Sequence, residues 1–375
     1  MTKTSIERLN EFGQSIWLDN ISRSMIQSGK LKDMINSGLK GLTSNPTIFD
    51  KAIRSSDDYD KEVQRFSRSG KSTFQIYDDL TVKDIQDAAD IFKPVYDMTN
   101  RLDGYVSLEV NPKLSYKPKE TVEEARRLFR KVNRPNIMLK VPATDAGFAA
   151  IEELLAEGIN INVTLIFSLE QYIKTAYAFL NGIDRLLEYG KDPRRVHSVA
   201  SVFVSRIDTL IDNVIDKRIA VAKDENEKDK LESLKGKTAA ANSSLIFEKY
   251  LEIFSGAKFK RLKEYGANLQ RVLWGSTGTK NPAYSDIKYV TELIGKNTIN
   301  TLPENTIKAF LDHGIVKETL TSDVRSAQDV IDGLNSFGIR IDSVCRKLLE
   351  NGVIAFEKSF DSLIASIETK EKVFM

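Results

Sequence analysis

The amino-acid sequence predicts an α/β fold, a (β/α)8 TIM barrel with additional N- and C-terminal helices. Three observations favour it: short apolar segments alternate with amphipathic helical patterns, eight such segments precede the last helices, and polar residues follow most of them. A chain of 375 residues could hold two domains, but α/β barrels of this size also fold as one. We expect a single domain over residues 1–375, with a barrel core at about 15–315 and a helical extension at about 320–375.

An open, doubly wound sheet would show the same alternation of strands and helices. Such sheets usually bind nucleotides through a glycine-rich turn after the first strand. Here no predicted strand is followed by G-x-G-x-x-G or by a phosphate-loop lysine motif. The barrel is therefore favoured, and nucleotide binding has little support.

Four predicted strands lie in the first half of the chain, after a helical lead-in over residues 1–15. Their residues are 15–20, 38–49, 103–110 and 136–144. The second segment is bounded by glycine and runs into a polar turn from Thr43 to Pro46. The fourth alternates with the two-residue period of a strand, and Pro142 ends it by removing a backbone donor.

Helical patterns separate these strands. One spans residues 22–38, and the charged residues 50–80 read as an irregular helical insertion. A helix is expected to begin at Thr81, where Asp84 occupies the capping-box position, and Pro94 is expected to kink or end it.

Two further helix starts follow from capping residues. Thr121 and Glu124 form a second predicted capping box. Thr144 is a good N-cap for the helix after the fourth strand, and Gly158 closes that helix.

The second half of the chain supplies the other four strands, at 160–167, 196–208, 268–282 and 297–303. Ser168 and Gln171 cap the helix after the fifth strand. A long helical stretch after the sixth is interrupted by the charged run 223–230, which we interpret as a solvated surface. Shorter helical patterns follow the last two strands, at 283–295 and 304–314, and residues 322–370 form two more amphipathic helices.

Composition excludes several classes of protein. Lys and Arg number 55 against 53 for Asp and Glu, so the net charge of +2 gives no basic field for nucleic acid or a lipid surface. No apolar run reaches transmembrane length, and the N-terminus lacks a signal-peptide core. The single cysteine, Cys345, lies in an apolar helical pattern as a core filler and fits a reducing cytoplasm. The two histidines are far apart, so a metal site is not expected.

Lys140 is the one charged residue inside the apolar strand 136–144. It could extend its ammonium to water or pair with a carboxylate, which is how most such lysines are accommodated. Alternatively, burial disfavours the charged form, and the neutral amine attacks carbonyl groups to form a Schiff base. This strand alone does not decide between the two interpretations.

Polar side chains at the carboxyl ends of the other strands favour the second interpretation, because barrel enzymes hold their chemistry there. These are Asp19, Asn45, Glu109, Asn162, Thr164, Ser201, Arg206 and Ser276. Each has an ordinary structural explanation alone, as an N-cap, a turn residue or a surface charge. A purely structural barrel has no need for all of them at one end.

The set suits Schiff-base chemistry on carbon–carbon bonds. Lys140 would attack a ketone, while Asp19 and Glu109 offer an acid and a base for the proton transfers. Thr164 could hold a water, and Asn45 and Asn162 could bind sugar hydroxyls. Arg206, Ser276 and Lys280 would supply positive charge and donors for a phosphate.

Six motifs in this order resemble the transaldolase family, in its longer form. They are WLDN around Asp19, GLTSNPTIF around Asn45, VSLEVNP around Glu109, IMLKVPAT around Lys140, EGININVTLIFS around Thr164 and SVFVSRID around Arg206. The resemblance spans about residues 15–303 and is specific, because each motif carries one of the polar side chains already singled out.

The resemblance implies a role for each residue. Lys140 would be the Schiff-base lysine, Glu109 and Thr164 would hold the catalytic water, and Asp19 would be the acid/base for bond cleavage. The residues that would bind the substrate are Thr43, Asn45, Asn162, Ser201, Phe203, Arg206, Ser276 and Lys280. In the short form an arginine accompanies the serine of the seventh strand, whereas this chain has WGSTGTKNP, with Lys280 as the replacing cation.

The implied reaction, in the pentose phosphate pathway, moves a dihydroxyacetone unit from sedoheptulose 7-phosphate to glyceraldehyde 3-phosphate. It needs no cofactor, its partners are phosphorylated sugars, and the enzyme would be a cytoplasmic monomer or homodimer. A related aldolase that releases dihydroxyacetone is the alternative. That branch has glutamine and tyrosine where this chain has Glu109 and Phe203, so transfer is favoured. A barrel that only binds sugar phosphates would be expected to lack Lys140 or both carboxylates.

Overall fold

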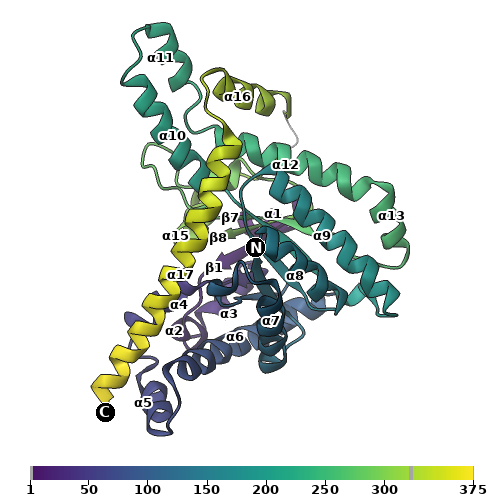
Figure 1. The fold of residues 1–375 in the computed structure, drawn as a ribbon, viewed down its shortest axis with the longest axis vertical. Helices are drawn as coiled ribbons and strands as arrows, with labels where there is room; N and C mark the ends of the chain where they lie inside the picture. The colour runs from purple at the N-terminus through teal and green to yellow at the C-terminus, as the bar shows by residue number, and fades with distance from the viewer. Residues whose placement is uncertain (1–2, 321–323, 375) are drawn as a thin grey trace.

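Eight parallel strands form a closed barrel in sequence order in the computed structural model, which describes residues 3–320 and 324–374 (Figure 1). Each strand pairs with the next along the chain, and β8 closes the barrel against β1. The strands are β1 (Gln14–Asp19), β2 (Gly41–Thr43), β3 (Val106–Glu109), β4 (Ile137–Pro142), β5 (Ile161–Ile166), β6 (Ser198–Phe203), β7 (Arg271–Gly275) and β8 (Thr298–Leu302). The predicted (β/α)8 barrel is confirmed, and the open sheet is excluded.

Helices connect the strands and surround the barrel. They are α1 (Ser5–Phe12), α2 (Arg23–Gln27), α3 (Lys30–Asn36), α4 (Pro46–Arg54), α5 (Asp60–Arg68), α6 (Thr73–Met98), α7 (Pro118–Val132), α8 (Asp145–Ala156), α9 (Leu169–Glu188), α10 (Ser205–Ile219), α11 (Glu225–Glu232), α12 (Thr238–Ser255), α13 (Ala257–Glu264), α14 (Lys288–Thr291), α15 (Glu304–His313), α16 (Val324–Ser336) and α17 (Ile341–Phe374). Short 3-10 turns lie at η1 (Pro112–Leu114) and η2 (Pro193–Arg195). Residues 1, 2, 321–323 and 375 of the predicted lead-in and extension lie outside the described residues.

Two predicted helix starts are wrong. The helix expected from Thr81 begins at Thr73, and its N-cap is Ser72. Thr81 lies inside α6, where its hydroxyl donates to the carbonyl of Tyr77 at 2.9 Å. Likewise α7 begins at Pro118, not Thr121. A threonine that bonds a backbone carbonyl in this way is tolerated within a helix, so the spacing of a capping box alone did not locate the start.

Other boundaries differ in extent. Pro94 does not end α6, which continues to Met98. The pattern over 22–38 divides into α2 and α3 at Gly29, whose φ of +82° ends the first helix. Most of the charged run at 223–230 is itself helical, in α11. Arg206, expected at the end of the sixth strand, lies in the first turn of α10.

Caps near the lysine strand are confirmed. Thr144 accepts the N–H of Gly147 at 2.9 Å and so starts α8 directly after β4. Ser168 and Gln171 form the predicted capping box at the start of α9. These short turns fix the carboxyl ends of β4 and β5 relative to the helices behind them.

The inward face of the barrel changes from apolar to polar along the strands. Near the amino ends, Trp17, Met138, Val199, Leu273 and Ile299 pack together with two tyrosines. Two positions further along the same strands, the side chains on that face are Asp19, Lys140, Ser201 and Thr301, and β7 has Gly275, which leaves space there. The barrel therefore has a packed apolar floor and a polar upper layer at its carboxyl end.

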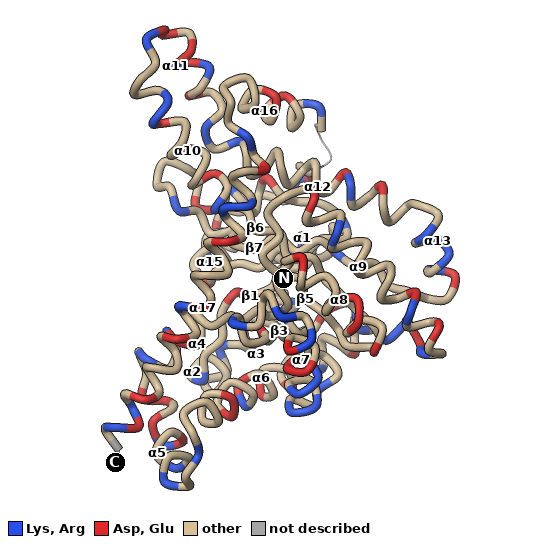
Figure 2. Tube along the Cα trace, in the orientation of Figure 1, with Lys and Arg blue, Asp and Glu red and all other residues tan. Residues whose placement is uncertain are grey.

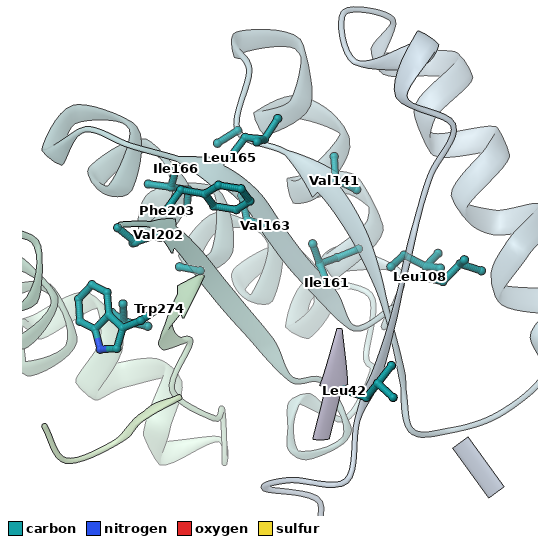
Figure 3. Close-up of a cluster of buried hydrophobic side chains, with 14 of the residues drawn as sticks. Leu42, Leu108, Val141, Ile161, Val163, Leu165, Ile166, Val202, Phe203 and Trp274 are labelled. Atoms are coloured by element: carbon teal, nitrogen blue, oxygen red, sulfur yellow. The ribbon is translucent and has the colours of Figure 1, made fainter. Parts of the chain in front are cut away.

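The outward faces of the strands form the main core with the surrounding helices. Figure 3 shows apolar side chains from neighbouring strands, including Val141, Ile161 and Val202, gathered in this layer. Cys345 of α17 is buried in the same core, as expected of a core filler, and its thiol donates to the carbonyl of Phe167 at 3.4 Å.

Helix α17 crosses the barrel from the side of α10 to the side of α5 (Figure 1). Polar contacts anchor it on α4: Asp50 accepts hydrogen bonds from Ser362 at 2.9 Å and from Ser366 at 2.8 Å. Thr47 donates to Ser359 at 2.8 Å. Helix α17 is thus bound to α4, the helix that follows β2.

Charged residues of both signs are interspersed along the outer helices (Figure 2). This distribution agrees with the net charge of +2. None of the helices in the described ranges is long and apolar enough to cross a membrane.

Candidate active site

A cavity of about 310 Å³ opens at the carboxyl ends of the strands. Ten of the twelve predicted site residues line it: Asp19, Thr43, Asn45, Lys140, Thr164, Ser201, Phe203, Arg206, Ser276 and Lys280. The other two, Glu109 and Asn162, lie behind this wall and contact residues of the predicted set. The topology therefore brings together side chains that are widely separated in sequence.

Lys140 is buried, with 4% of its surface exposed. Its Nζ donates to the carbonyl of Ser44 at 3.0 Å and lies 3.6 Å from Oε2 of Glu109. The two residues are direct neighbours in register on β3 and β4. The lysine therefore does not extend to bulk water; it pairs with a carboxylate and faces the cavity.

Glu109 is held in an environment that favours its protonated form. It is 6% exposed, and burial raises its pKa to about 7, although the Lys140 ammonium opposes that rise. Its Oε2 has no hydrogen-bond partner among the described residues. A carboxyl group with a pKa near neutrality can both give and take a proton under physiological conditions.

Thr164 is fully buried on β5, the strand on the other side of β4. Its hydroxyl oxygen likewise lacks a partner in the described part of the chain. Buried polar atoms are almost always satisfied by protein or by ordered water. Glu109 and Thr164 flank Lys140 on adjacent strands, so their free atoms suit a water beside the amine.

Asp19 ends β1 on the opposite side of the barrel. Burial raises its pKa, while the Lys140 ammonium and a hydrogen bond from the Thr43 hydroxyl oppose that rise. The Thr43 oxygen lies 2.9 Å from Oδ1 of Asp19 and 2.8 Å from the hydroxyl of Thr301. This chain of hydroxyls orients one carboxylate oxygen and leaves the other for the cavity.

Amide side chains support the wall of the cavity. Asn162 donates to the hydroxyl of Ser107 at 3.0 Å and accepts from that of Ser201 at 2.6 Å. Asn45 caps α4 through its Oδ1, which accepts the N–H of Ile48 at 3.0 Å. The amide nitrogen of Asn45 is thereby directed away from the helix that its oxygen caps.

Two residues at this end of the barrel adopt left-handed backbone conformations. Leu165 has φ +60° and lies where the pairing of β5 with β6 shifts register, directly after Thr164. Ser276 has φ +53° directly after β7. Such conformations are costly for residues with a Cβ and concentrate at functional sites.

Arg206 and Lys280 add positive charge to the cavity, which Lys140 also lines. Neither forms an ion pair with another described residue. The guanidinium of Arg206 lies 5.3 Å from the ring centroid of Phe203, and burial lowers its pKa, which Asp19 opposes. Two cations that form no ion pair among the described residues suit an anionic ligand.

The cavity also contains residues that the sequence did not single out, including Thr47, Thr301 and Phe356. Thr301 lies at the carboxyl end of β8, so the strand-end rule could have found it. Phe356 comes from α17, and its ring centroid is 6.0 Å from Nζ of Lys140. Nothing in its helical pattern distinguishes it from a core phenylalanine.

The fold and this site define a class. A buried lysine beside carboxylates at the carboxyl end of a (β/α)8 barrel is the arrangement of an enzyme that forms Schiff bases with carbonyl substrates.

The comparisons identify the family within that class. The family model for transaldolase/fructose-6-phosphate aldolase matches residues 16–367. A protein named transaldolase from Trichodesmium erythraeum is 45% identical over 99% of both chains. Transaldolase 2 of Nostoc punctiforme is 44% identical over 100% of this chain and 99% of its own, and that of Streptomyces coelicolor is 43% identical over 98% and 97%. The chain belongs to the transaldolase/fructose-6-phosphate aldolase family, and the resemblance inferred from the motifs is confirmed.

Proposed function

We propose that the protein is a transaldolase of the pentose phosphate pathway. It transfers a dihydroxyacetone unit from sedoheptulose 7-phosphate to glyceraldehyde 3-phosphate, giving erythrose 4-phosphate and fructose 6-phosphate. The observation that carries the proposal is Lys140, buried 3.6 Å from Glu109 and facing the same cavity as Asp19. The family membership supports the substrates.

Schiff-base formation begins when the neutral amine of Lys140 attacks the ketone carbon of the donor. The carbinolamine then loses its hydroxyl as water, and the nitrogen becomes an iminium. We assign the proton transfers to a water between Glu109 and Thr164. The unpartnered Oε2 and hydroxyl of these residues support that assignment, as does the raised pKa of Glu109.

Carbon–carbon cleavage follows on the other side of the cavity. Asp19 takes the proton of the hydroxyl on the carbon beyond the breaking bond. The bonding electrons move into the iminium, which becomes an enamine, and an aldehyde leaves. The acceptor aldehyde then reacts in reverse: the enamine attacks its carbonyl carbon, and Asp19 returns the proton to the new hydroxyl.

Polar residues around the cavity orient the substrate. Asn45 and Asn162 orient the donor, the latter through the Ser201 hydroxyl that it holds. Thr43 positions Asp19. The phosphate is bound by Arg206, Ser276 and Lys280 at one end of the cavity.

Transfer instead of release depends on the enamine remaining unprotonated until an aldehyde arrives. Phe203 supports transfer because its ring offers no hydroxyl. It packs edge-on against Phe167, with centroids 5.4 Å apart, beneath Arg206. Phe356 adds a second apolar surface near the lysine.

We further propose a single domain over residues 1–375 that works in the cytoplasm as a monomer or homodimer. The contacts of α17 with α4 and its contribution of Phe356 to the cavity support one domain.

Borohydride reduction with fructose 6-phosphate and no acceptor tests the proposal. Peptide mapping is expected to find a reduced three-carbon adduct on Lys140. An active, folded protein without any adduct would refute the Schiff-base mechanism, and an adduct on another lysine would refute the site. A coupled assay for free dihydroxyacetone then separates transfer from release.

A further inference from the structure

The loop after β7 carries two of the proposed phosphate ligands. It is anchored at its start, where the buried Thr277 hydroxyl donates to the carbonyl of Thr301 at 2.9 Å, but it is exposed from Lys280 to Ala283. Ser276 begins it, Lys280 lies within it at the edge of the cavity, and Asn281 to Ala283 are exposed. Thr279 donates to the carbonyl of Ser285 at 2.8 Å, which closes the loop on itself. Such a segment needs an external attachment to hold an ammonium group in one place.

Tyr284 supplies that attachment. Its hydroxyl donates to Oδ2 of Asp212 on α10 at 2.8 Å. The other oxygen of Asp212 accepts the N–H of Gly236 at 3.0 Å. The tyrosine ring lies so close to Gly236 that an added Cβ there would come within 2.7 Å of it. The Asp212 carboxylate therefore binds the Tyr284 hydroxyl, and the absence of a side chain at Gly236 leaves space for the Tyr284 ring.

A second bridge repeats the arrangement one helical turn earlier. Tyr289 donates to Oδ2 of Asp208 at 2.9 Å, and Oδ1 of Asp208 accepts the N–H of Ala239 at 2.7 Å. Asp208 and Asp212 are four residues apart, so they lie on one face of α10. The two bridges join the segment 276–289, helix α10 and the start of α12.

Helix α10 also carries the third proposed phosphate ligand, because Arg206 lies in its first turn. The backbone ties the two regions where the loop begins: Val204 and Ser205 donate to the carbonyls of Gly275 and Ser276, each at 3.0 Å. The hydroxyls of Ser205 and Ser276 also meet at 3.2 Å, and Thr277 is bonded to Thr301. The Tyr–Asp bridges hold the segment that follows Lys280 on α10.

We propose that Tyr284 and Tyr289 are positioning residues for phosphate recognition. Through Asp212 and Asp208 they hold the loop of Lys280 against α10, the helix whose first turn carries Arg206. This inference rests on the proposed function. Tyr284 has the larger effect because it is four residues from Lys280 within the same closed loop.

The test compares Tyr284→Phe and Tyr289→Phe with Tyr265→Phe, a control at an exposed tyrosine of α13's C-cap. Each variant is assayed with fructose 6-phosphate and with unphosphorylated fructose as donor. For Tyr284→Phe we expect KM for the phosphorylated donor to rise about three- to tenfold, the range for one lost hydrogen bond, with kcat unchanged. KM for fructose should stay unchanged in Tyr284→Phe. The control, Tyr265→Phe, should keep the wild-type KM for both donors.

A double-mutant cycle with Lys280→Met sharpens the test. If Tyr284 acts through Lys280, adding Tyr284→Phe to Lys280→Met causes no further rise in KM. Equal losses with both donors, or full additivity with Lys280→Met, would overturn the inference and leave a structural role only. If Tyr284→Phe fails to fold, Asp212→Asn replaces it, because the amide retains one acceptor.

Failure of the proposed function is distinguishable from failure of this inference. A wild-type protein that forms no borohydride adduct with either donor contradicts the function itself. A wild-type protein that forms adducts while Tyr284→Phe keeps its KM for fructose 6-phosphate contradicts only the positioning role.

Discussion

Two buried ion pairs lie at opposite ends of the barrel and differ in how completely they are satisfied. At the amino end, Arg271 contacts Asp103 at 2.7 Å, and the two side chains are 7% and 5% exposed. At the carboxyl end, the side chains of Lys140 and Glu109 are each 5% exposed, but their Nζ and Oε2 atoms stand 3.6 Å apart. Equal burial thus accompanies two very different degrees of pairing.

Hydrogen bonds account for the difference. Asp103 accepts from Ser15 at 2.8 Å and from Trp17 at 3.2 Å, and Arg271 donates to Ser15 at 3.0 Å as well. Around Lys140, by contrast, Oε2 of Glu109 and the hydroxyl of Thr164 have no partner among the described residues. A buried ion pair with its hydrogen bonds complete stabilises a unique packing, whereas an incomplete one retains groups for chemistry.

Neutralising the cation of each pair should produce opposite phenotypes, and this is the largest expected effect. Lys140→Met removes the proposed nucleophile, so kcat should fall by more than about 10³-fold while the free energy of unfolding is maintained. Arg271→Met leaves Asp103 buried and unpaired, so unfolding should become easier by about 3–5 kcal/mol with activity per folded molecule retained. Chemical denaturation and steady-state kinetics on both variants check this. Equal destabilisation of the two would contradict the comparison.

Glu109→Gln should change how the free energy of unfolding depends on pH. Because burial raises the pKa of Glu109 to about 7, the folded protein keeps a proton that the unfolded chain releases above its ordinary pKa of 4.5. Stability should therefore fall as pH rises from about 4.5 to 7, by up to about 3 kcal/mol, and the glutamine variant should lack this dependence.

Catalytic activity should rise with pH over the range in which stability falls. Wild-type kcat/KM, which reports the pKa values of the free enzyme, should rise with pH through about 7 as Glu109 ionises and can accept a proton. Glu109→Gln should lose this limb, with kcat lower by about 10²-fold. A rising limb that persists unchanged in the variant would assign the titration to another group.

The smallest effects should come from single hydroxyls. Thr164→Val removes an oxygen that lacks a partner, so stability should be maintained while kcat falls by about tenfold or more. Ser15→Ala removes two hydrogen bonds of the Arg271–Asp103 pair. The free energy of unfolding should therefore fall by about 1–3 kcal/mol without loss of kcat. Thermal denaturation alongside kinetics distinguishes the two. A stability loss in Thr164→Val equal to that in Ser15→Ala would mean that Thr164 is structural.

Much of the fold and the site follows from local sequence. The strands were predictable because their apolar runs end in polar residues, and the barrel then required Asp19, Glu109 and Lys140 to share one end. Thr144 and Ser168 were predictable as caps because each directly follows a buried strand.

Other features depend on tertiary contacts that local patterns do not contain. Thr81 and Thr121 have the spacing of caps but bond backbone carbonyls inside or before their helices. Phe356 reaches the cavity only because α17 returns across the barrel more than two hundred residues after Lys140. The role of Asp212 likewise depends on Tyr284, seventy-two residues away.

The order of the chain has a consequence for biosynthesis. All eight strands, with Lys140 among them, precede Ile341, where α17 begins. On the ribosome, the barrel can therefore close before the helix that brings Phe356 to the lysine has emerged. The apolar surface that Phe356 adds near the proposed Schiff-base lysine therefore arises only as the final helix docks on α4.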